Sequence, residues 1–227
     1  MATIYKLGLI DAPWKYDNEQ QNDPKRGGIQ YPTLSMKELA VIPIGKAFDK
    51  DSVIVVWATF PKLMDFYYEK YNPITVINAW GFRPVTALFV WIKLNRTARV
   101  INQGANPYWE EDKNDANEYE HIRTADFYSG LGRYSNSNAE IAIVARKGKG
   151  LPRLAKNVKQ LIFSPIRAHS EKPPEQYDRL DRLYGDVSRV EIFARKQNPP
   201  PNGWDAVGLD WEPSLDIRDW IKQYENV

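Results

Sequence analysis

Residues 9–16 read LIDAPWKY, in which an apolar run ends directly in an aspartate, a proline and a tryptophan. Residues 7–10 predict a short buried strand, so Asp11 is expected at the carboxyl end of that strand. Ligands of open α/β sheets bind outside these carboxyl ends. Pro13 fixes its own φ and biases Ala12 toward an extended backbone, which stiffens the surroundings of the acid. The stretch therefore predicts either a site built on a rigid carboxylate or a plain strand-end turn beside a half-buried tryptophan.

The polar groups of this stretch suit an amine as their ligand. The Asp11 carboxylate and the Ala12 carbonyl are both acceptors, and an exocyclic amine carries two N–H donors. Trp14 is expected to stack on the ring that bears the amine. Hydrogen bonds drawn from the amine would leave its nitrogen lone pair free to attack an electrophilic methyl group.

Five further apolar runs predict the other strands of one sheet. Their near-continuous hydrophobicity is typical of strands that are covered on both faces. Helical spacings lie between them, and strands that alternate with helices indicate an α/β fold with a mainly parallel central sheet flanked by helices. The expected strands are residues 53–58, 87–92, 141–145, 161–163 and 190–194, and the expected helices are residues 36–40, 62–71, 177–184 and 215–224.

The composition is that of an intracellular globular protein. A chain of 227 residues can bury a substantial core, so residues 1–227 are expected to form one domain. The net charge is only +2, so any contact with nucleic acid must rely on local positive charge. Cysteine is absent, which excludes disulfides and indicates a reducing compartment. No signal peptide or membrane-spanning run is recognisable, and the two histidines show no metal-ligand spacing, so a cytoplasmic protein without a metal is expected.

Two long polar stretches show no regular pattern. Residues 15–32 contain a glycine pair, and residues 95–138 contain an acidic patch with several glycines and asparagines. Loops of this length in a compact domain are usually binding loops or lids, or else disordered. We interpret both as loops that handle the target.

The sequence resembles the MT-A70 family of S-adenosylmethionine-dependent N6-adenine methyltransferases. The family's Asp-Pro-Pro-Trp motif corresponds to Asp-Ala-Pro-Trp here, and three more blocks follow in the family's order. This resemblance implies a Rossmann-like class I methyltransferase fold in which the catalytic motif is N-terminal to the cofactor strand. The blocks are residues 11–14, residues 55–63 with 79–93 (VVWATFPKL and AWGFRPVTALFVWIK), residues 130–150 (GLGRYSNSNAEIAIVARKGKG) and residues 169–210, from HSEKPPEQ to GWDAVGLD.

The resemblance also implies roles for individual residues. An acid and an aromatic are kept in the catalytic motif, whereas Ala12 replaces the family's first proline and Gly208-Leu209-Asp210 stands where Gly-Asn is frequent. For Glu191 and Arg195 the alternative to a role in cofactor binding is a surface ion pair between them, and for Lys172 it is a solvated side chain at a helix start. The catalytic residues are expected to be Asp11, Ala12, Pro13 and Trp14, and the cofactor-binding residues Asp11, Lys172, Glu191, Phe193, Arg195 and Asn198.

The substrate implied by the family is an adenine that has been flipped out or is unpaired, because a stacked base cannot reach such a pocket. Local basic residues would contact phosphates, or would simply be solvated loop charges. The basic rim is expected to include Lys15, Lys25, Arg26, Lys93, Arg96, Arg99 and Arg133, and the substrate-binding set is Lys15, Tyr16, Tyr31, Lys93, Arg96 and Arg133, with core packing as the alternative for Tyr31.

DNA is the favoured substrate, because only ten residues precede the motif and a compact form resembles the bacterial and phage members of the family. RNA is the first alternative. The second is a catalytically silent, nucleic-acid-binding member, although such members tend to lose the acid or the aromatic of the motif. Asp11 argues against a cytosine-N4 enzyme, which usually carries serine there. The sequence leaves open whether the protein forms a homodimer.

Overall fold

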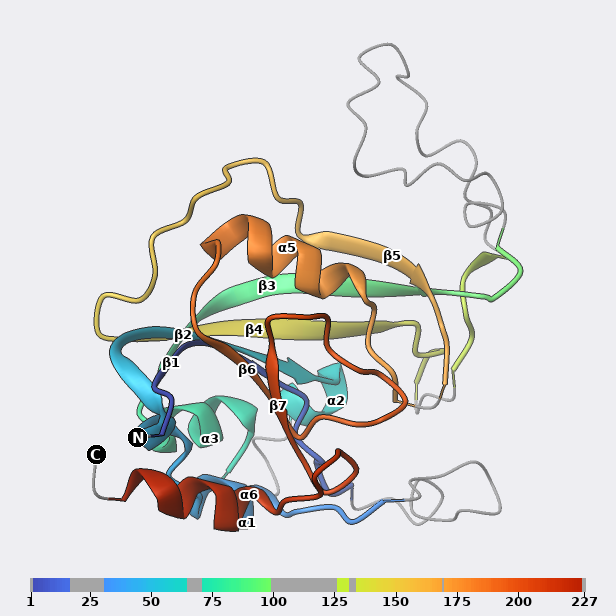
Figure 1. Ribbon diagram of the computed structural model, residues 1–227. Coiled ribbons are helices and arrows are strands. Elements are labelled where there is room, and N and C mark those ends of the chain that lie inside the picture. Colours follow the sequence, from blue (N-terminus) through green and yellow to red (C-terminus); the bar gives the residue numbers. More distant parts are fainter. Residues whose placement is uncertain are drawn as a thin grey trace.

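The computed structural model describes residues 2–16, 31–64, 71–98, 126–130, 134–168 and 170–225. Within these ranges a curved seven-stranded sheet runs through the centre in the order β5-β3-β4-β2-β1-β6-β7 (Figure 1). The strands are β1 (Tyr5–Ile10), β2 (Phe48–Ala58), β3 (Arg83–Leu94), β4 (Ala139–Lys147), β5 (Leu161–Pro165), β6 (Arg189–Ile192) and β7 (Asp205–Val207). The helices are α1 (Met36–Val41), α2 (Phe60–Leu63), α3 (Pro73–Ala79), α5 (Glu175–Tyr184) and α6 (Ile217–Trp220), with 3-10 helices at Ile44–Ala47 and Ile221–Tyr224.

The sheet is mainly parallel, as the sequence predicted. β1 pairs in parallel with β2 and β6, β6 with β7, and β3 with β5. Of the described strands β4 alone is reversed, and it lies antiparallel between β2 and β3. Glu140 at its start is opposite Trp91, near the end of β3. The reversal therefore brings the amino end of β4 to the edge where the parallel strands end.

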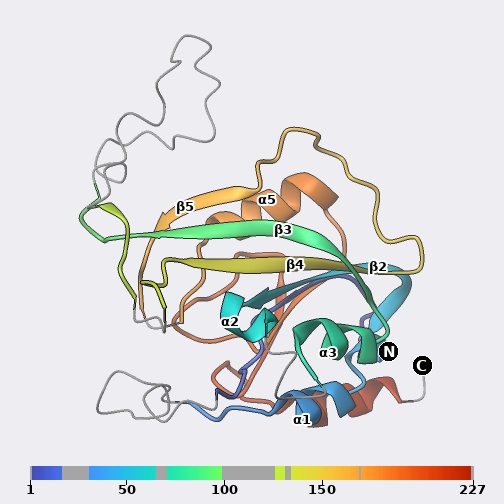
Figure 2. The same ribbon diagram turned by 180° about the vertical axis from the view of Figure 1, so that it is seen from behind.

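Both faces of the sheet are covered, which explains the continuous apolar runs. Alternate residues of β2 enter two separate cores, with Ile54 and Val56 in one and Val55 and Trp57 in the other. Figures 1 and 2 show α5 on one face and α1 and α3 on the opposite face. Burial on both faces is the reason that these strands lack the polar alternation of a half-exposed sheet.

Six of the strands lie where apolar runs predicted them, five with longer bounds and β6 ending already at Ile192, whereas β7 and α3 were missed. β7 has only three residues and no apolar run. α3 has the sequence PITVINA, whose β-branched residues are poor helix formers. It forms because Asn72 and Thr75 cap its first turn reciprocally and Pro73 occupies a position that needs no N–H donor.

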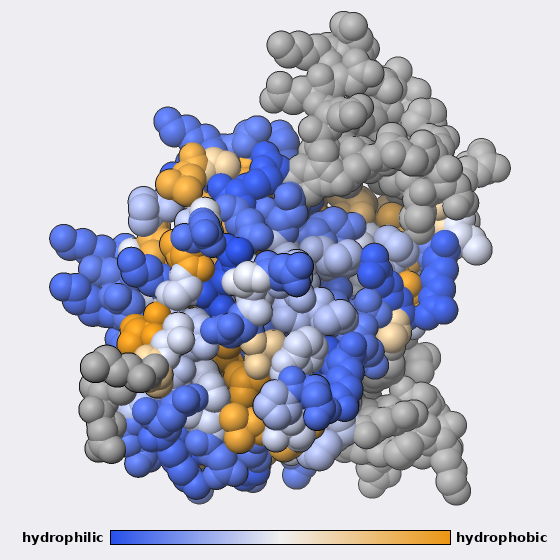
Figure 3. Space-filling model, viewed as in Figure 1, coloured by the Kyte–Doolittle hydropathy of each residue, from blue (hydrophilic) through white to orange (hydrophobic). Residues whose placement is uncertain are grey.

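The helices predicted over residues 36–40 and 177–184 are confirmed, and residues 215–224 contain the short α6 followed by a 3-10 helix. The capping box of Ser35 and Glu38 starts α1, and Gly185, with φ +73°, ends α5. The helix expected over residues 62–71 is a single turn that ends at Leu63, and residues 65–70 lie outside the described part. No described helix has the length and apolar character needed to cross a bilayer. Hydrophilic residues predominate on the face in Figure 3, with apolar ones in small separate groups.

Candidate active site

The Asp-Ala-Pro-Trp motif forms a rigid bracket directly after β1. The N–H of Trp14 donates to the Ala12 carbonyl at 2.8 Å, which closes a tight turn. The N–H of Leu34 donates to the Pro13 carbonyl at 2.8 Å, and that of Lys15 to the Leu34 carbonyl at 3.0 Å. These bonds clamp the motif to the segment before α1. The Ala12 carbonyl keeps its second lone pair for another donor.

Trp14 is buried, which corrects its predicted role as a stacking surface. The indole is 4% exposed, packs into the core with α1, and donates from Nε1 to the Trp57 carbonyl at 3.0 Å. A ring that is covered on both sides offers no face to a base. The alternative of a strand-end turn with a half-buried tryptophan is therefore the better description of this residue. Trp14 anchors the motif to the core through its packing and its bond to the Trp57 carbonyl.

Asp11 is the first member of a chain of alternating charges. Its Oδ2 accepts from Lys172 Nζ at 2.9 Å, and the same ammonium lies 3.4 Å from Glu140 Oε2. Glu140 Oε1 in turn accepts from Lys93 Nζ at 2.6 Å. The four side chains come from the ends of β1, β3 and β4 and from the segment before α5. The topology alone brings them together, because these ends share one edge of the sheet.

Burial makes these charges depend strongly on one another. Burial by itself would lower the pKa of Lys172, but the carboxylates of Asp11 and Glu140 outweigh it and hold that pKa above its usual value. Burial would likewise raise the pKa of Glu140, but Lys172 and Lys93 outweigh it and hold that pKa low. Both groups are therefore charged at neutral pH. Lys172 is 6% exposed, so the alternative of a solvated lysine is wrong.

Two hydrogen bonds of α5 fix the position of Lys172, which lies three residues before the helix. Gln176 Oε1 accepts from the indole of Trp57 on β2 at 2.6 Å. The hydroxyl of Tyr177 donates to Glu191 Oε2 on β6 at 2.7 Å. The first turn of α5 is thereby tied to two strands of the sheet, and the segment that carries Lys172 cannot move without breaking buried contacts.

The predicted substrate residues do not form one group. Lys93 belongs to the buried charge chain and lies 5.0 Å over the Trp91 ring, which contradicts its prediction as a phosphate contact on the rim. Lys15 and Arg96 are exposed, and Arg96 donates to the Arg167 carbonyl. The hydroxyls of Tyr16 and Thr59 are hydrogen-bonded at 3.2 Å. Lys25, Arg26, Arg99 and Arg133 lie outside the described residues.

Tyr31 and Arg195, predicted for substrate and cofactor respectively, are in direct contact. The Arg195 guanidinium lies 3.6 Å from the centroid of the Tyr31 ring. The Tyr31 hydroxyl is 3.2 Å from Ser170 Oγ. No ion pair joins Arg195 to Glu191 in the described part of the chain, so that alternative is wrong. Tyr31 thus links the end of β6 to the segment that carries Lys172.

A cavity of about 710 Å³ opens beside these residues. It connects Pro13 of the motif and Tyr31 with Phe193 and Arg195, so it joins predicted catalytic and cofactor residues in one space. Asn198 does not line it, although its N–H donates to the Arg195 carbonyl at 3.1 Å in the same turn. Asp210, which stands where the family often carries asparagine and could supply that cofactor hydrogen bond, also lines the cavity. Lining residues that the sequence reasoning did not assign are Pro32, Leu34, Ala194, Gln197, Leu209, Asp216, Ile217 and Arg218.

Close backbone contacts shape the wall of this cavity. Phe193 has φ +67°, and the N–H of Ala194 donates to the Val207 carbonyl at 2.9 Å. A Cβ at Gly208 would lie 2.3 Å from the Ala194 carbonyl oxygen, so only glycine fits there. The segments after β6 and β7 can therefore run side by side, and the backbone N–H of Lys196 donates to the Asp210 carbonyl at 2.8 Å.

Glu191 is a buried acid with a strongly shifted pKa. It is 6% exposed on β6, where it pairs with Leu9 of β1. Burial raises its pKa to about 7, although the hydrogen bond from Tyr177 opposes the shift. Folding therefore favours the protonated form of this carboxyl near neutral pH.

This shift predicts a pH dependence of stability. The folded protein binds the Glu191 proton more tightly than the unfolded chain does, so the contribution is complete below about pH 4.3 and is lost as the pH rises to about 7. Glu191→Gln, which retains an acceptor for Tyr177, should be stabilised relative to wild type at pH 8 by on the order of 2 kcal/mol and by little at pH 4. Urea unfolding at both pH values measures the difference.

The same substitution at the exposed Glu212 is the control and should leave the pH profile unchanged. If the Glu191→Gln and wild-type profiles run parallel from pH 4 to pH 8, Glu191 does not titrate in that range.

Glu140 is the member of the buried charge chain to which the sequence reasoning gave no role. It was visible as an acid directly ahead of the apolar residues 141–145. An acid before a strand belongs at the amino edge of a parallel sheet, far from Asp11. Only the reversed direction of β4 places it next to Lys172.

Comparison with known proteins agrees with this architecture. The chain is 28% identical over 223 residues to the Type II methyltransferase M.MunI of Mycoplasma sp., covering 91% of this chain and 77% of that protein. It is 24% identical over 204 residues to the human N(6)-adenosine-methyltransferase catalytic subunit METTL3, and 25% identical over 211 residues to a putative N(6)-adenosine-methyltransferase MT-A70-like protein of Medicago truncatula. The chain spans 28% and 27% of the length of these two proteins, about a quarter in each case. The sequence model of the MT-A70 family matches residues 5–210, from β1 to the residue that follows Leu209 in the cavity wall, and the chain therefore belongs to the MT-A70 family.

Proposed function

We propose that this protein is a methyltransferase that transfers the methyl group of S-adenosylmethionine to the N6 amine of adenine in DNA. The observation that carries the proposal is the Asp11 carboxylate, which is held at the carboxyl end of β1 by a buried ammonium at 2.9 Å. A fixed acceptor at this edge of the sheet, next to the Ala12 carbonyl, is what the recognition of an amine requires. The position of the acid of the Asp-Ala-Pro-Trp motif at this end of β1 supports the proposal.

The residues present fit S-adenosylmethionine, which when bound supplies an electrophilic methyl group on a sulfonium. Its amino-acid end carries an ammonium and a carboxylate, and the adjacent Asp11 and Lys172 offer the two complementary charges. Its nucleoside end requires a cavity with donors for ribose hydroxyls, and the cavity of about 710 Å³ is in the usual range for ligands of this size. Lys172 and Asp11 would hold the amino-acid end, while Phe193, Arg195 and Asn198 would hold the nucleoside, with Glu191 behind them.

The chemistry required of the protein's own side chains is modest. The Asp11 carboxylate and the Ala12 carbonyl accept the two hydrogens of the target amine and so orient its lone pair. When the nitrogen gains a methyl group it must release one proton, and the carboxylate that already accepts a hydrogen bond from it is the adjacent base. Lys172 acts through Asp11 by fixing the position of that carboxylate.

The comparisons support DNA over RNA without excluding the latter. M.MunI is named as a type II methyltransferase, and the match extends over 77% of its length. The relatives named as N(6)-adenosine methyltransferases match over about a quarter of theirs. A base in a duplex would have to be flipped to reach Asp11. A nucleic-acid substrate also implies an intracellular protein.

The decisive experiment is transfer of labelled methyl from S-adenosylmethionine to duplex DNA, single-stranded DNA and RNA, followed by nucleoside analysis. Label in N6-methyladenine from DNA supports the proposal, whereas label only in RNA favours the RNA enzyme. No transfer to any of them, together with no cofactor binding by calorimetry, would favour the silent family member.

Asn198→Ala should weaken cofactor binding more than it slows turnover at saturation. The loss of one amide that bonds a ribose hydroxyl costs about 1–1.5 kcal/mol, so the cofactor Kd should rise about tenfold while kcat changes less than about threefold. Calorimetric titration and saturation kinetics measure the two quantities. Asn157→Ala is the matched control, because Asn157 accepts a hydrogen bond from Arg182 in a segment that contributes no residue to the cavity wall. An unchanged Kd in Asn198→Ala would remove this residue from the site.

A further inference from the structure

The positive charge of the chain is concentrated in residues 146–160, RKGKGLPRLAKNVKQ, which we call the basic crossover. This segment contains six Lys and Arg and no acidic residue, whereas the rest of the chain carries 25 basic against 29 acidic residues. A protein that is close to neutral as a whole therefore has one segment with a charge of +6 and a slightly negative remainder. The local positive charge that a nucleic-acid contact requires lies here.

The basic crossover starts at the end of the sheet opposite to Asp11 and ends near the middle of β3. It leaves the end of β4, where Lys147 pairs with Ser52, and passes outside α5 to the start of β5 (Figure 1). At its end the Gln160 carbonyl accepts from the N–H of Val90, halfway along β3. The two ends of the segment thus lie beside Arg83 and Val90 of β3, and between them it passes outside α5.

Its backbone is fixed at several points although residues 148–160 form neither helix nor strand. The N–H of Lys149 donates to Asp51 Oδ1 at 2.7 Å, and that of Leu154 to the Leu183 carbonyl at 2.8 Å. The guanidinium of Arg179, which is 1% exposed, donates to the carbonyl of Lys159 at 2.8 Å. A fixed backbone presents its charged side chains at defined positions, so less conformational entropy is lost when they bind.

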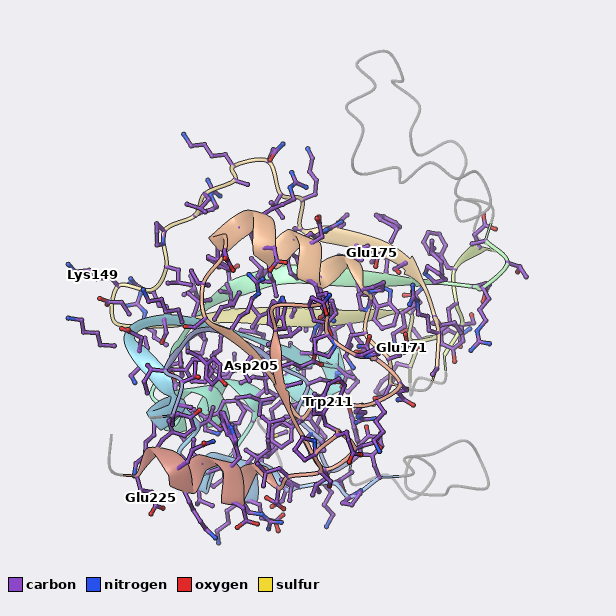
Figure 4. The ribbon with its side chains drawn as sticks, viewed as in Figure 1. Lys149, Glu171, Glu175, Asp205, Trp211 and Glu225 are labelled. Carbon is purple, nitrogen blue, oxygen red and sulfur yellow. The ribbon has the colours of Figure 1, made fainter. Side chains whose placement is uncertain are left out.

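Four charged side chains of the basic crossover lack a carboxylate partner among the described residues. Lys149, Arg153, Lys156 and Lys159 are exposed, and none forms an ion pair with a carboxylate in the described part of the chain. Figure 4 shows Lys149 directed away from the protein. By contrast, the exposed Lys222 is paired with Asp219. Like charges gathered on one surface repel one another until a polyanion neutralises them.

We propose that the basic crossover binds the phosphate backbone of the nucleic acid at a distance from the target base. The inference rests on the proposed nucleic-acid substrate and adds a second contact surface to it. From Arg83 to Leu94, β3 spans about 36 Å, and B-DNA rises about 3.4 Å per base pair. A duplex along this side would therefore reach from the catalytic edge to the far end of the crossover in about 11 base pairs.

The test compares two triple variants that remove the same charge. One is Lys149→Gln/Lys156→Gln/Lys159→Gln on the crossover, and the control is Lys6→Gln/Lys37→Gln/Lys222→Gln on other exposed surfaces. Fluorescence anisotropy with a duplex of about 24 base pairs, at salt concentrations from about 50 to 200 mM, gives the Kd and its salt slope. The crossover variant should bind about tenfold or more weakly, and its slope should fall by about 2–3, since each phosphate contact contributes about 0.9. The control should stay within about twofold of wild type.

Length dependence supplies the second readout. A duplex of about 8 base pairs spans about 27 Å, so one held at the catalytic edge reaches Lys159 but not Lys149, and the crossover variant should lose less affinity for it than for long DNA. The KM for long DNA should rise in the variant, while kcat at saturation should not change. Equal losses in both triple variants, or a loss that is the same for short and long DNA, would overturn the inference and leave the proposed function intact. If wild type binds no nucleic acid at low salt, the proposed function itself fails.

Discussion

Asp11→Ala should lower methyl transfer to adenine by about a hundredfold to a thousandfold. The substitution removes the acceptor that orients the target amine and the base nearest to its proton, and the loss of one such group costs about 10²–10³ in rate. Single-turnover transfer to the preferred substrate, at saturating cofactor, measures this step without a contribution from product release. Asp11→Asn, which keeps the size and one acceptor oxygen, should recover a small part of the rate.

The fold should survive the loss of Asp11, because Lys172 retains Glu140 at 3.4 Å as a counter-charge. Circular dichroism and thermal unfolding provide the check. A folded variant with turnover within about tenfold of wild type would overturn the assignment of Asp11 as the amine acceptor.

Lys172→Met should have the second large effect, because it removes the only cation that lies between two carboxylates of the charge chain. Asp11 and Glu140 have side chains that are 19% and 13% exposed, so water compensates them only in part. Breaking a buried ion pair lowers the free energy of unfolding by about 3–5 kcal/mol. Because these groups are only partly buried, we expect Lys172→Met to lower it by about 2–4 kcal/mol. The Kd for S-adenosylmethionine should rise about a hundredfold or more, since the charge that faces its carboxylate is lost.

A charge-balanced double variant separates structure from binding. Lys172→Met/Asp11→Asn leaves the ion pair of Glu140 with Lys93 intact and no unpaired carboxylate at Asp11, so most of the lost stability should return. Cofactor affinity should stay low, because no ammonium faces the carboxylate. Urea unfolding and calorimetric titration of the single and double variants complete the cycle. Affinity that returns together with stability would mean that Lys172 has only a structural role.

The position of Asp11 could be predicted from the sequence because strong local signals determine it. An apolar run of four residues that is buried on both faces must be a strand in this setting, and a proline two residues after the aspartate ends it. The same reasoning located most strands and the ends of α1 and α5, where capping residues act within one turn. The mainly parallel sheet followed from the alternation of strands and helices.

What the sequence by itself determined was therefore most of the elements, with β7 and α3 as exceptions, and the placement of Asp11 at the end of β1, since burial and capping are read over a few neighbouring residues. The tertiary structure alone decided that β4 is reversed, that Glu140 and Lys93 join the charge chain, and that Trp14 lies beneath the motif instead of facing a ligand. The physical reason is that strand direction and side-chain partners depend on contacts between residues far apart in the chain. Lys172 and Asp11 are 161 residues apart, and no local pattern records that they meet.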